Sequence, residues 1–368
     1  MMGKSRLQVL LLALLLFSAA TLFVMRNMTK QITYVVRGCP TDDPYENSRR
    51  SPEVPRDKSL QTQVTNTTMV PSTRETSTAN YTMEEHFNEK VPAHVAQSIS
   101  KLYHKLKANG SIINDLITTE YPVIPNVFHY VRFNQSFLKF YAMLSIKSAL
   151  RINPEKVYIH TNSPPQGHFW DMIKNDPRIK VVHRDPPTSI FGKEFGWVQH
   201  GSDLARIQIL REHGGIYLDN DCIVINEFER ERKHHCVVSK SSEERHMGNM
   251  FMMATTDCVF MQLYEELYRL DYQRHIWYYN GGELPQYALL DQYPGIAFMA
   301  DEGVAQRLIS LLWNENTDVE YLQKYWSVVH LYYGHKDYTY NDTTDYNEKN
   351  IYNISNGFTK LARFILDD

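Results

Sequence analysis

The chain has little net charge, few cysteines and no internal repeat. Its 39 basic and 42 acidic residues leave a formal net charge of −3, so it lacks the basic excess with which proteins bind nucleic acid. We therefore expect no nucleic-acid partner. Its 4 cysteines include no Cys-x-x-Cys pair, and no His/Cys spacing indicates a structural zinc site.

Large apolar residues are scarce between about residues 26 and 119. Such a segment cannot bury enough surface to offset the entropy of ordering it. Residues 51–82 are rich in Ser, Thr and Pro, which is typical of an extended, O-glycosylated stem. Residues 94–106 have helical apolar spacing and form either a stem helix or the first element of a domain. We assign 26–119 to a lumenal stem and expect the core from Tyr121 onward.

Residues 7–25 contain no charged side chain. As a helix this run would reach roughly 28 Å, close to the hydrocarbon thickness of a bilayer. It predicts a transmembrane signal-anchor behind a short cytoplasmic tail, residues 1–6. Small residues before Leu22 leave an alternative, cleavage of a signal peptide near Ala20 and secretion of the remainder.

Asparagine-linked glycosylation sequons are spread over the chain beyond this run. Together with the hydrophobic N-terminus they indicate that everything C-terminal to it is translocated, which predicts a single-pass type II membrane protein. The Asn-x-Ser/Thr triplets begin at Asn27, Asn66, Asn80, Asn109, Asn134, Asn341 and Asn353.

The cysteines suit an oxidising lumen. Among the three possible connectivities we favour Cys236 with Cys258, because this pair closes a short loop within the globular part. The alternative is that the cysteines are unpaired, buried small residues. A disulfide here would tie together two segments of the domain that follows the stem.

From Tyr121 onward, strand-like and helical segments alternate, and Gly214 is expected to end a helix. This alternation predicts an α/β domain over residues 120–368 with a mostly parallel sheet. In such sheets ligands bind at the carboxyl ends of the strands. Strands are predicted at 127–131, 157–160, 179–182 and 216–218, and helices at 137–150, 169–174 and 202–213.

The strand at 216–218 runs directly into Asp219-Asn220-Asp221. This places two carboxylates at the carboxyl edge of the sheet, spaced to share one divalent cation such as Mn²⁺ or Mg²⁺. Such a cation neutralises the phosphates of a nucleoside diphosphate and makes the diphosphate a better leaving group. A triplet of this form is also common as a polar turn after an apolar strand, so its context decides.

That context is the preceding helix, in which Asp203 and Arg206 share one face. They could form a surface ion pair of little worth, but a sugar-nucleotide site needs both an Asp for sugar hydroxyls and an Arg for a hydroxyl or phosphate. Residues 202–221 resemble the sugar-binding region with DXD motif of a retaining glycosyltransferase family. That family includes Golgi α-1,4-galactosyl- and α-1,4-N-acetylglucosaminyltransferases and yeast mannosyltransferases, and its pattern Asp-x-x-Arg, then Gly-Gly-x-Tyr-x-Asp-x-Asp, is met in full.

The resemblance implies a GT-A-like, Rossmann-type catalytic domain and roles for particular residues. It departs from the family's pattern at Gly282, where Pro is common, and at Tyr332, where Trp is common. For His330 the alternative is a satisfied core histidine. The implied residues are Asp219, Asp221 and His330 for the metal, Asp203, Arg206, Asp219 and Asn249 for the donor sugar, His129 and Tyr130 for the nucleotide, and Asn249 and Glu283 as catalytic groups near the anomeric carbon.

The implied activity is that of a retaining hexosyltransferase of the Golgi membrane, with a nucleotide sugar as donor and a glycan or glycolipid as acceptor. UDP-galactose and UDP-N-acetylglucosamine are favoured, and GDP-mannose stays open. One alternative is a catalytically inactive glycoprotein that binds a glycan or a protein partner. A glycosidase is the other, but Asp219 and Asp221 lie on one turn and do not naturally flank a scissile bond.

Overall fold

The computed structural model describes residues 90–111, 119–240, 246–300, 312–313 and 319–367. The chain divides into two compact units, Met1–Ser77 and Thr78–Asp368, and all described residues belong to the second. The predicted cytoplasmic tail, the transmembrane segment and most of the stem lie outside the described residues, as does Cys39. Within the described ranges, no helix is both long and apolar enough to cross a bilayer.

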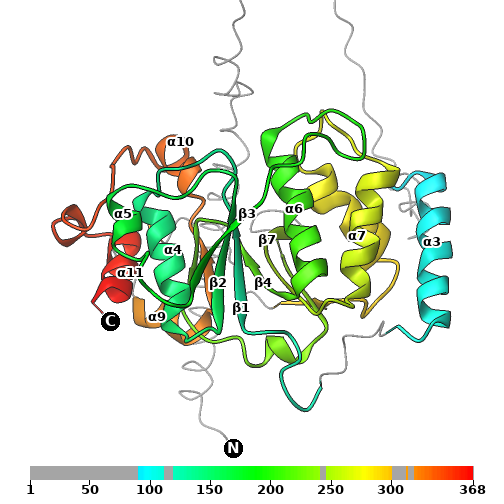
Figure 1. Ribbon diagram of the computed structural model, residues 1–368, viewed down its shortest axis with the longest axis horizontal. Coiled ribbons are helices and arrows are strands. Elements are labelled where there is room, and N and C mark those ends of the chain that lie inside the picture. Colours follow the sequence, from blue (N-terminus) through cyan, green and yellow to red (C-terminus); the bar gives the residue numbers. More distant parts are fainter. Residues whose placement is uncertain (1–89, 112–118, 241–245, 301–311, 314–318, 368) are drawn as a thin grey trace, which may run out of the picture. The chain divides into compact units, whose positions relative to one another are not determined.

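A seven-stranded sheet forms the centre of this unit (Figure 1). Its strands are β1 (Val127–Val131), β2 (Lys156–Thr161), β3 (Ile179–His183), β4 (Gly215–Leu218), β6 (Cys236–Lys240), β7 (Met247–Ala254) and β8 (Phe298–Met299). They lie in the order β3-β2-β1-β4-β7-β6-β8. The first four are parallel, β7 is antiparallel to both its neighbours, and β8 is parallel to β6. The prediction of a mostly parallel sheet is confirmed.

Helices cover both faces of this sheet (Figure 1). On one face lie α4 (Phe140–Arg151) and α11 (Gly357–Leu366), and on the other α6 (Val198–His213) and α7 (Val259–Leu270). Two short strands, β5 (Cys222–Val224) and β9 (Val328–His330), form a separate antiparallel pair. Shorter elements complete the fold: α5 (His168–Asp171), η2 (Glu231–Lys233), η3 (Tyr279–Glu283), η4 (Gln286–Leu290), α9 (Val319–Tyr325), η5 (Tyr333–His335), α10 (Lys336–Tyr340) and η6 (Asn350–Tyr352).

The segment with helical spacing before residue 120 forms α3 (Ala93–Ala108). Its Val95 and Ile99 side chains are buried in the same apolar cluster as α6 and α7. Because it packs on α7, α3 is an element of the unit Thr78–Asp368. Of the two interpretations of this segment, the packing favours the first element of the domain.

Successive side chains of β1 point to opposite faces of the sheet. Phe128 and Tyr130 enter the cluster that contains α4, whereas Val131 enters the cluster that contains α6. The helix α6 ends at Gly214, as predicted, where φ is +65° and the N–H bonds to the Leu210 carbonyl at 2.8 Å. Glycine adopts this left-handed conformation without steric cost. The chain can therefore turn at once into β4.

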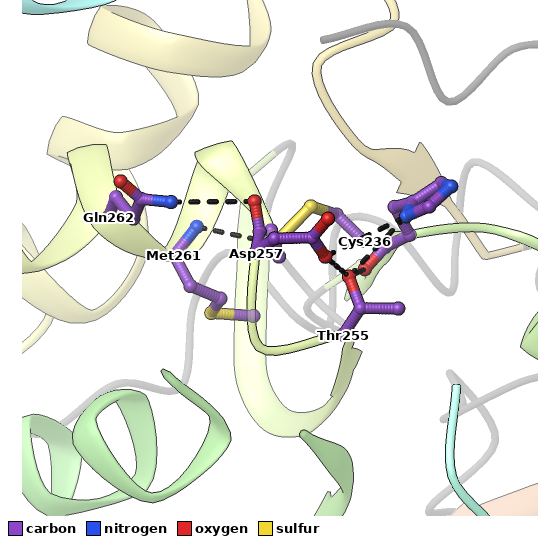
Figure 2. Close-up of a disulfide and its surroundings, with 7 residues drawn as sticks. Cys236, Thr255, Asp257, Met261 and Gln262 are labelled. Atoms are coloured by element: carbon purple, nitrogen blue, oxygen red, sulfur yellow. Dashed lines mark hydrogen bonds and ion pairs between the residues drawn. A yellow bond between two sulfur atoms is a disulfide. The ribbon is translucent and has the colours of Figure 1, made fainter. Parts of the chain in front are cut away.

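The favoured disulfide is confirmed, because Cys236 and Cys258 are bonded. Figure 2 shows this bond between the start of β6 and the start of α7. Cys258 also caps α7, since its sulfur accepts a hydrogen bond from the Met261 N–H at 3.4 Å. Cys222 is a buried free thiol. The disulfide thus joins the antiparallel side of the sheet to the helix that covers it.

Candidate functional site

The Asp219-Asn220-Asp221 triplet forms the tight connection between β4 and β5. β4 pairs with β1 on one side and β7 on the other, while β5 pairs with β9 through the Cys222–His330 register. The triplet therefore lies at the carboxyl edge of the parallel strands, where a ligand site was expected. Segments from β1, α6, β7 and β9 all meet it there.

Arg206 on α6 is the centre of a hydrogen-bonded cluster. Its Nη2 lies 3.2 Å from Asp203 Oδ1 and 3.2 Å from Asp219 Oδ1. Its Nη1 donates to the Asn249 carbonyl at 2.8 Å and to Asn249 Oδ1 at 3.0 Å. Asn249 Nδ2 in turn donates to Asp203 Oδ1 at 2.9 Å, and the guanidinium lies over the Tyr217 ring. All four predicted donor-sugar residues are therefore in one cluster.

Asp221 is held from the opposite side by β9 and the residues after it. Its Oδ1 lies 3.1 Å from His330 Nε2, and its Oδ2 accepts the Tyr333 N–H at 3.0 Å. Burial alone would raise the pKa of Asp221, but the His330 charge and these hydrogen bonds hold it below the ordinary value. His330, the late histidine singled out in the sequence, thus contacts the triplet directly.

The carboxylates of the triplet are more open to solvent than the rest of the cluster. The side chains of Asp219 and Asp221 are 28 % and 19 % exposed, against 6 % for Arg206 and 11 % for Asp203. Burial raises the pKa of Asp219, and the Arg206 charge opposes that rise. Asp203 and Arg206 therefore form the floor of the site, with the triplet at its open side.

The donor set suits a hard divalent cation. Asp221, His330 and Cys222 offer possible ligand atoms that lie within 4.8 Å of one another, and carboxylate and imidazole ligands suit Mn²⁺, Mg²⁺ and related ions. The Cys222 sulfur lies near them, but burial raises the pKa of this thiol far above its ordinary value, which favours the neutral form over a thiolate ligand. Asp221 and His330 are therefore the fitting ligands, with Asp219 beside them.

Among the described residues, no hydrogen bond or ion pair joins the remaining predicted site residues, His129, Tyr130 and Glu283, to this cluster. His129 and Tyr130 are fully buried in β1. His129 Nε2 bonds to the Gly214 carbonyl, and the Tyr130 hydroxyl donates to the Ser145 carbonyl. Glu283 is the last residue of η3 and is half-buried. The nucleotide role of the first two and the catalytic role of Glu283 stay predictions.

Two residues whose side chains contact the triplet were not predicted from the sequence. The Tyr217 hydroxyl donates to Asp219 Oδ1 at 2.8 Å, and Arg132 Nη1 donates to Asn220 Oδ1 at 3.1 Å. Tyr217 could have been found, because it lies two residues before Asp219 in the quoted motif. Nothing in the local pattern singles out Arg132, which follows an apolar strand.

Residues 140–238 match the model of a protein family described as the glycosyltransferase sugar-binding region containing DXD motif. The matched segment contains Asp203, Arg206 and the triplet. It ends before Asn249 and His330, which the fold brings to the same place. The match supports a glycosyltransferase-like function for the chain.

Glucan organizing enzyme 1 from Cryptococcus neoformans var. grubii serotype A is 34 % identical over 93 residues, or 25 % of this chain and 25 % of that protein. The chain thus matches about a quarter of this relative's length. Among solved structures, the PaToxG glycosyltransferase is 16 % identical with a TM-score of 0.34, covering 55 % of this chain and 79 % of that one. The bifunctional glycosyltransferase WbbM in its apo form is 12 % identical with a TM-score of 0.33, covering 69 % and 56 %.

Proposed function

We propose that this chain is a metal-dependent glycosyltransferase that moves a hexose from a nucleotide sugar to a hydroxyl group of a glycan or glycolipid, with retention at the anomeric carbon. The observation that carries the proposal is the hydrogen-bonded cluster of Asp203, Arg206 and Asp219, with Asp221 and His330 beside it. UDP-galactose and UDP-N-acetylglucosamine are the favoured donors. The domain is proposed to be of the GT-A-like, Rossmann type.

In this proposal Asp221 and His330, with Asp219, hold Mn²⁺ or Mg²⁺. When bound, the ion neutralises the charge of the diphosphate leaving group. Asp203 offers carboxylate oxygens to the donor-sugar hydroxyls, and Arg206 and Asn249 fix its orientation. A preorganised set of this kind orients the donor without rearrangement during the reaction.

Retention is proposed to follow a front-face route. The cluster's carboxylates pair with Arg206 and His330. The acceptor hydroxyl oxygen bonds to the anomeric carbon while the bond to the diphosphate oxygen breaks. The hydroxyl proton passes to that departing oxygen, so this route needs no protein nucleophile. Asn249 borders the donor-sugar residues and positions them.

The proposed location is the Golgi membrane, with residues 7–25 as the anchor and the catalytic domain in the lumen. The sequons and the Cys236–Cys258 disulfide support passage through an oxidising compartment. Cleavage near Ala20 would instead give a secreted enzyme with the same site. Detection of the N-terminal tail in the mature protein by mass spectrometry distinguishes these two forms.

The proposed activity is tested by incubating the full chain with Mn²⁺ and UDP-galactose, UDP-N-acetylglucosamine or GDP-mannose, and measuring nucleotide release. Asp221→Asn should reduce turnover by about 100-fold or more, because it removes a ligand charge from the metal site. Asp171→Asn, which alters an exposed carboxylate on α5, should leave turnover unchanged. Full turnover of Asp221→Asn would refute the metal assignment. A wild-type chain that bound neither UDP nor Mn²⁺ would instead be a non-catalytic binding glycoprotein.

A further inference from the structure

The middle residue of the triplet is fixed as firmly as the carboxylates on either side of it. Asn220 Nδ2 donates to the Val131 carbonyl at 2.8 Å, and Asn220 Oδ1 accepts from Arg132 Nη1 at 3.1 Å. Both partners belong to the carboxyl end of β1 or the residue after it. The Asn220 amide therefore joins the triplet to the parallel sheet.

Arg132 is an unusual cation because its partners are neutral. Its residue surface is only 2 % exposed, and Nη2 donates to the Phe137 carbonyl at 3.1 Å. Across the described part of the chain, no carboxylate pairs with it, and its buried Nε has no hydrogen-bond acceptor. Burying such a charge costs stability. Arg206, buried to a similar degree, has two carboxylate partners.

The backbone of Arg132 is also tied to its neighbours. Its N–H donates to the His160 carbonyl at 2.9 Å, and its carbonyl accepts from the Thr161 hydroxyl at 2.7 Å. The guanidinium thus projects from a point held by both β1 and β2. It reaches the triplet at Asn220 and the approach to α4 at Phe137. Its position is set by the sheet rather than by the triplet.

Each residue of the triplet is therefore held by a different element. Arg206 on α6 holds Asp219, Arg132 beyond β1 holds Asn220, and His330 on β9 holds Asp221. The Asp219 and Asp221 side chains must keep a fixed separation if they are to share one cation. A turn of three residues pinned at all three side chains has little freedom to change that separation.

We propose that Arg132 is a positioning residue of the transferase site, which acts through Asn220 to fix the directions of Asp219 and Asp221 for a divalent cation and the diphosphate it carries. The inference deepens the proposed function and rests on it.

The test compares Arg132→Met, Arg132→Lys and Asn220→Ala in the full chain. Mn²⁺ affinity is measured with and without UDP by titration calorimetry, together with kcat and KM for nucleotide release and the thermal midpoint. Arg132→Met should weaken Mn²⁺ binding about 10- to 100-fold and lower kcat about 100-fold. Arg132→Lys keeps the charge but cannot donate to Asn220 and Phe137 at the same time. Its Mn²⁺ affinity and kcat should therefore stay close to those of Arg132→Met.

The matched control is Arg178→Met. Arg178 also stands at a strand end and donates to a backbone carbonyl, that of Leu150 at 2.8 Å, but it pairs with Asp176 and lies outside the cluster. It should lower the thermal midpoint without changing Mn²⁺ affinity. Asn220→Ala removes the Arg132–Asn220 hydrogen bond by changing its other partner. It therefore tests the same contact if Arg132→Met does not fold. In the double variant Arg132→Met/Asn220→Ala, the loss should equal that of Arg132→Met alone.

Unchanged Mn²⁺ affinity and kcat in both Arg132→Met and Asn220→Ala would overturn the positioning role while leaving the proposed function intact. Full recovery in Arg132→Lys would show that only the charge matters and would also overturn it. Additive losses in the double variant would mean that Arg132 does not act through Asn220. A wild-type chain that neither binds Mn²⁺ nor releases nucleotide would overturn the proposed function together with this inference.

Discussion

Replacing His160 with glutamine should make the folded domain less sensitive to acid. His129 Nε2 lies 2.9 Å from the Gly214 carbonyl, which can only accept, so this nitrogen carries the proton. His129 Nδ1 must then accept from His160 Nε2 at 3.0 Å. His160 Nδ1 is buried without an acceptor among the described residues. A further proton on either ring would find no partner.

Burial is the main reason why the pKa of His129 and that of His160 are each lowered to about 3, and the nearby Arg184 charge contributes. In the unfolded chain both rings return to about 6.5. Between these values the unfolded chain binds protons that the folded chain excludes, so stability is complete above pH 6.5 and falls as the pH falls toward 3. At pH 5.5 each ring lowers the free energy of unfolding by about 1.4 kcal/mol, and the two rings together lower it by about 3 kcal/mol.

His160→Gln keeps an amide donor toward His129 but removes one titrating ring. The stability difference between pH 7.5 and pH 5.5 should therefore shrink by about 1.4 kcal/mol relative to the wild type. Urea unfolding at both pH values measures this difference, with His183→Gln, whose side chain is 72 % exposed, as the control. The same pH dependence in His160→Gln and the wild type would refute the reasoning.

Other substitutions test the ion-pair cluster, the disulfide and the packing of α3. Arg206→Leu leaves Asp203 and Asp219 without their cation and should lower the free energy of unfolding by about 3 kcal/mol at pH 7. The loss should be smaller at pH 5, because burial raises the pKa of Asp219 and favours its neutral form. Urea unfolding at both pH values measures the two losses, and equal losses would contradict the prediction. Cys258→Ser removes the disulfide, whose cysteines are 22 residues apart, and should lower the free energy of unfolding by about 3 kcal/mol. Thermal midpoints with and without reductant measure the effect, and a wild type whose midpoint does not change with reductant would contradict it. Ile99→Ala should cost about 2–4 kcal/mol in urea unfolding, and an unchanged midpoint would show that α3 unfolds separately.

The parallel part of the fold could be predicted because its signals are local. The strand at Val127–Val131 and the end of α6 at Gly214 each follow from a short pattern. The strands β5 to β9 were not predicted. Met247–Ala254, for example, is apolar apart from Gly248 and Asn249 and lacks the alternation that marks a half-buried strand. Its place depends on pairing with β4 and β6, which no short window contains.

Some residues of the site could likewise be predicted from local sequence, and others could not. Asp203, Arg206 and Asp219 lie within one short segment, so their spacing could be interpreted from the sequence alone. Asn249 and His330 were named only through the resemblance, and strand pairing explains why they meet the cluster. Arg132 could not be identified from the sequence, because a single arginine after an apolar strand is common. Its proposed role depends on contact with Asn220, which lies 88 positions away.

The β5–β9 pair makes completion of this site a late event in the life of the chain. His330 and Asp221 are 109 residues apart, and His330 reaches the triplet only when β9 pairs with β5. In a chain that grows from its N-terminus, Asp203, Arg206 and Asp219 are therefore synthesised long before the histidine. Forming so distant a contact also carries a greater loop-closure entropy. A nascent or prematurely terminated chain that stops before Val328 contains Asp203, Arg206 and Asp219 but lacks the histidine that we propose as a metal ligand, so ion binding in this proposal depends on synthesis of the C-terminal segment.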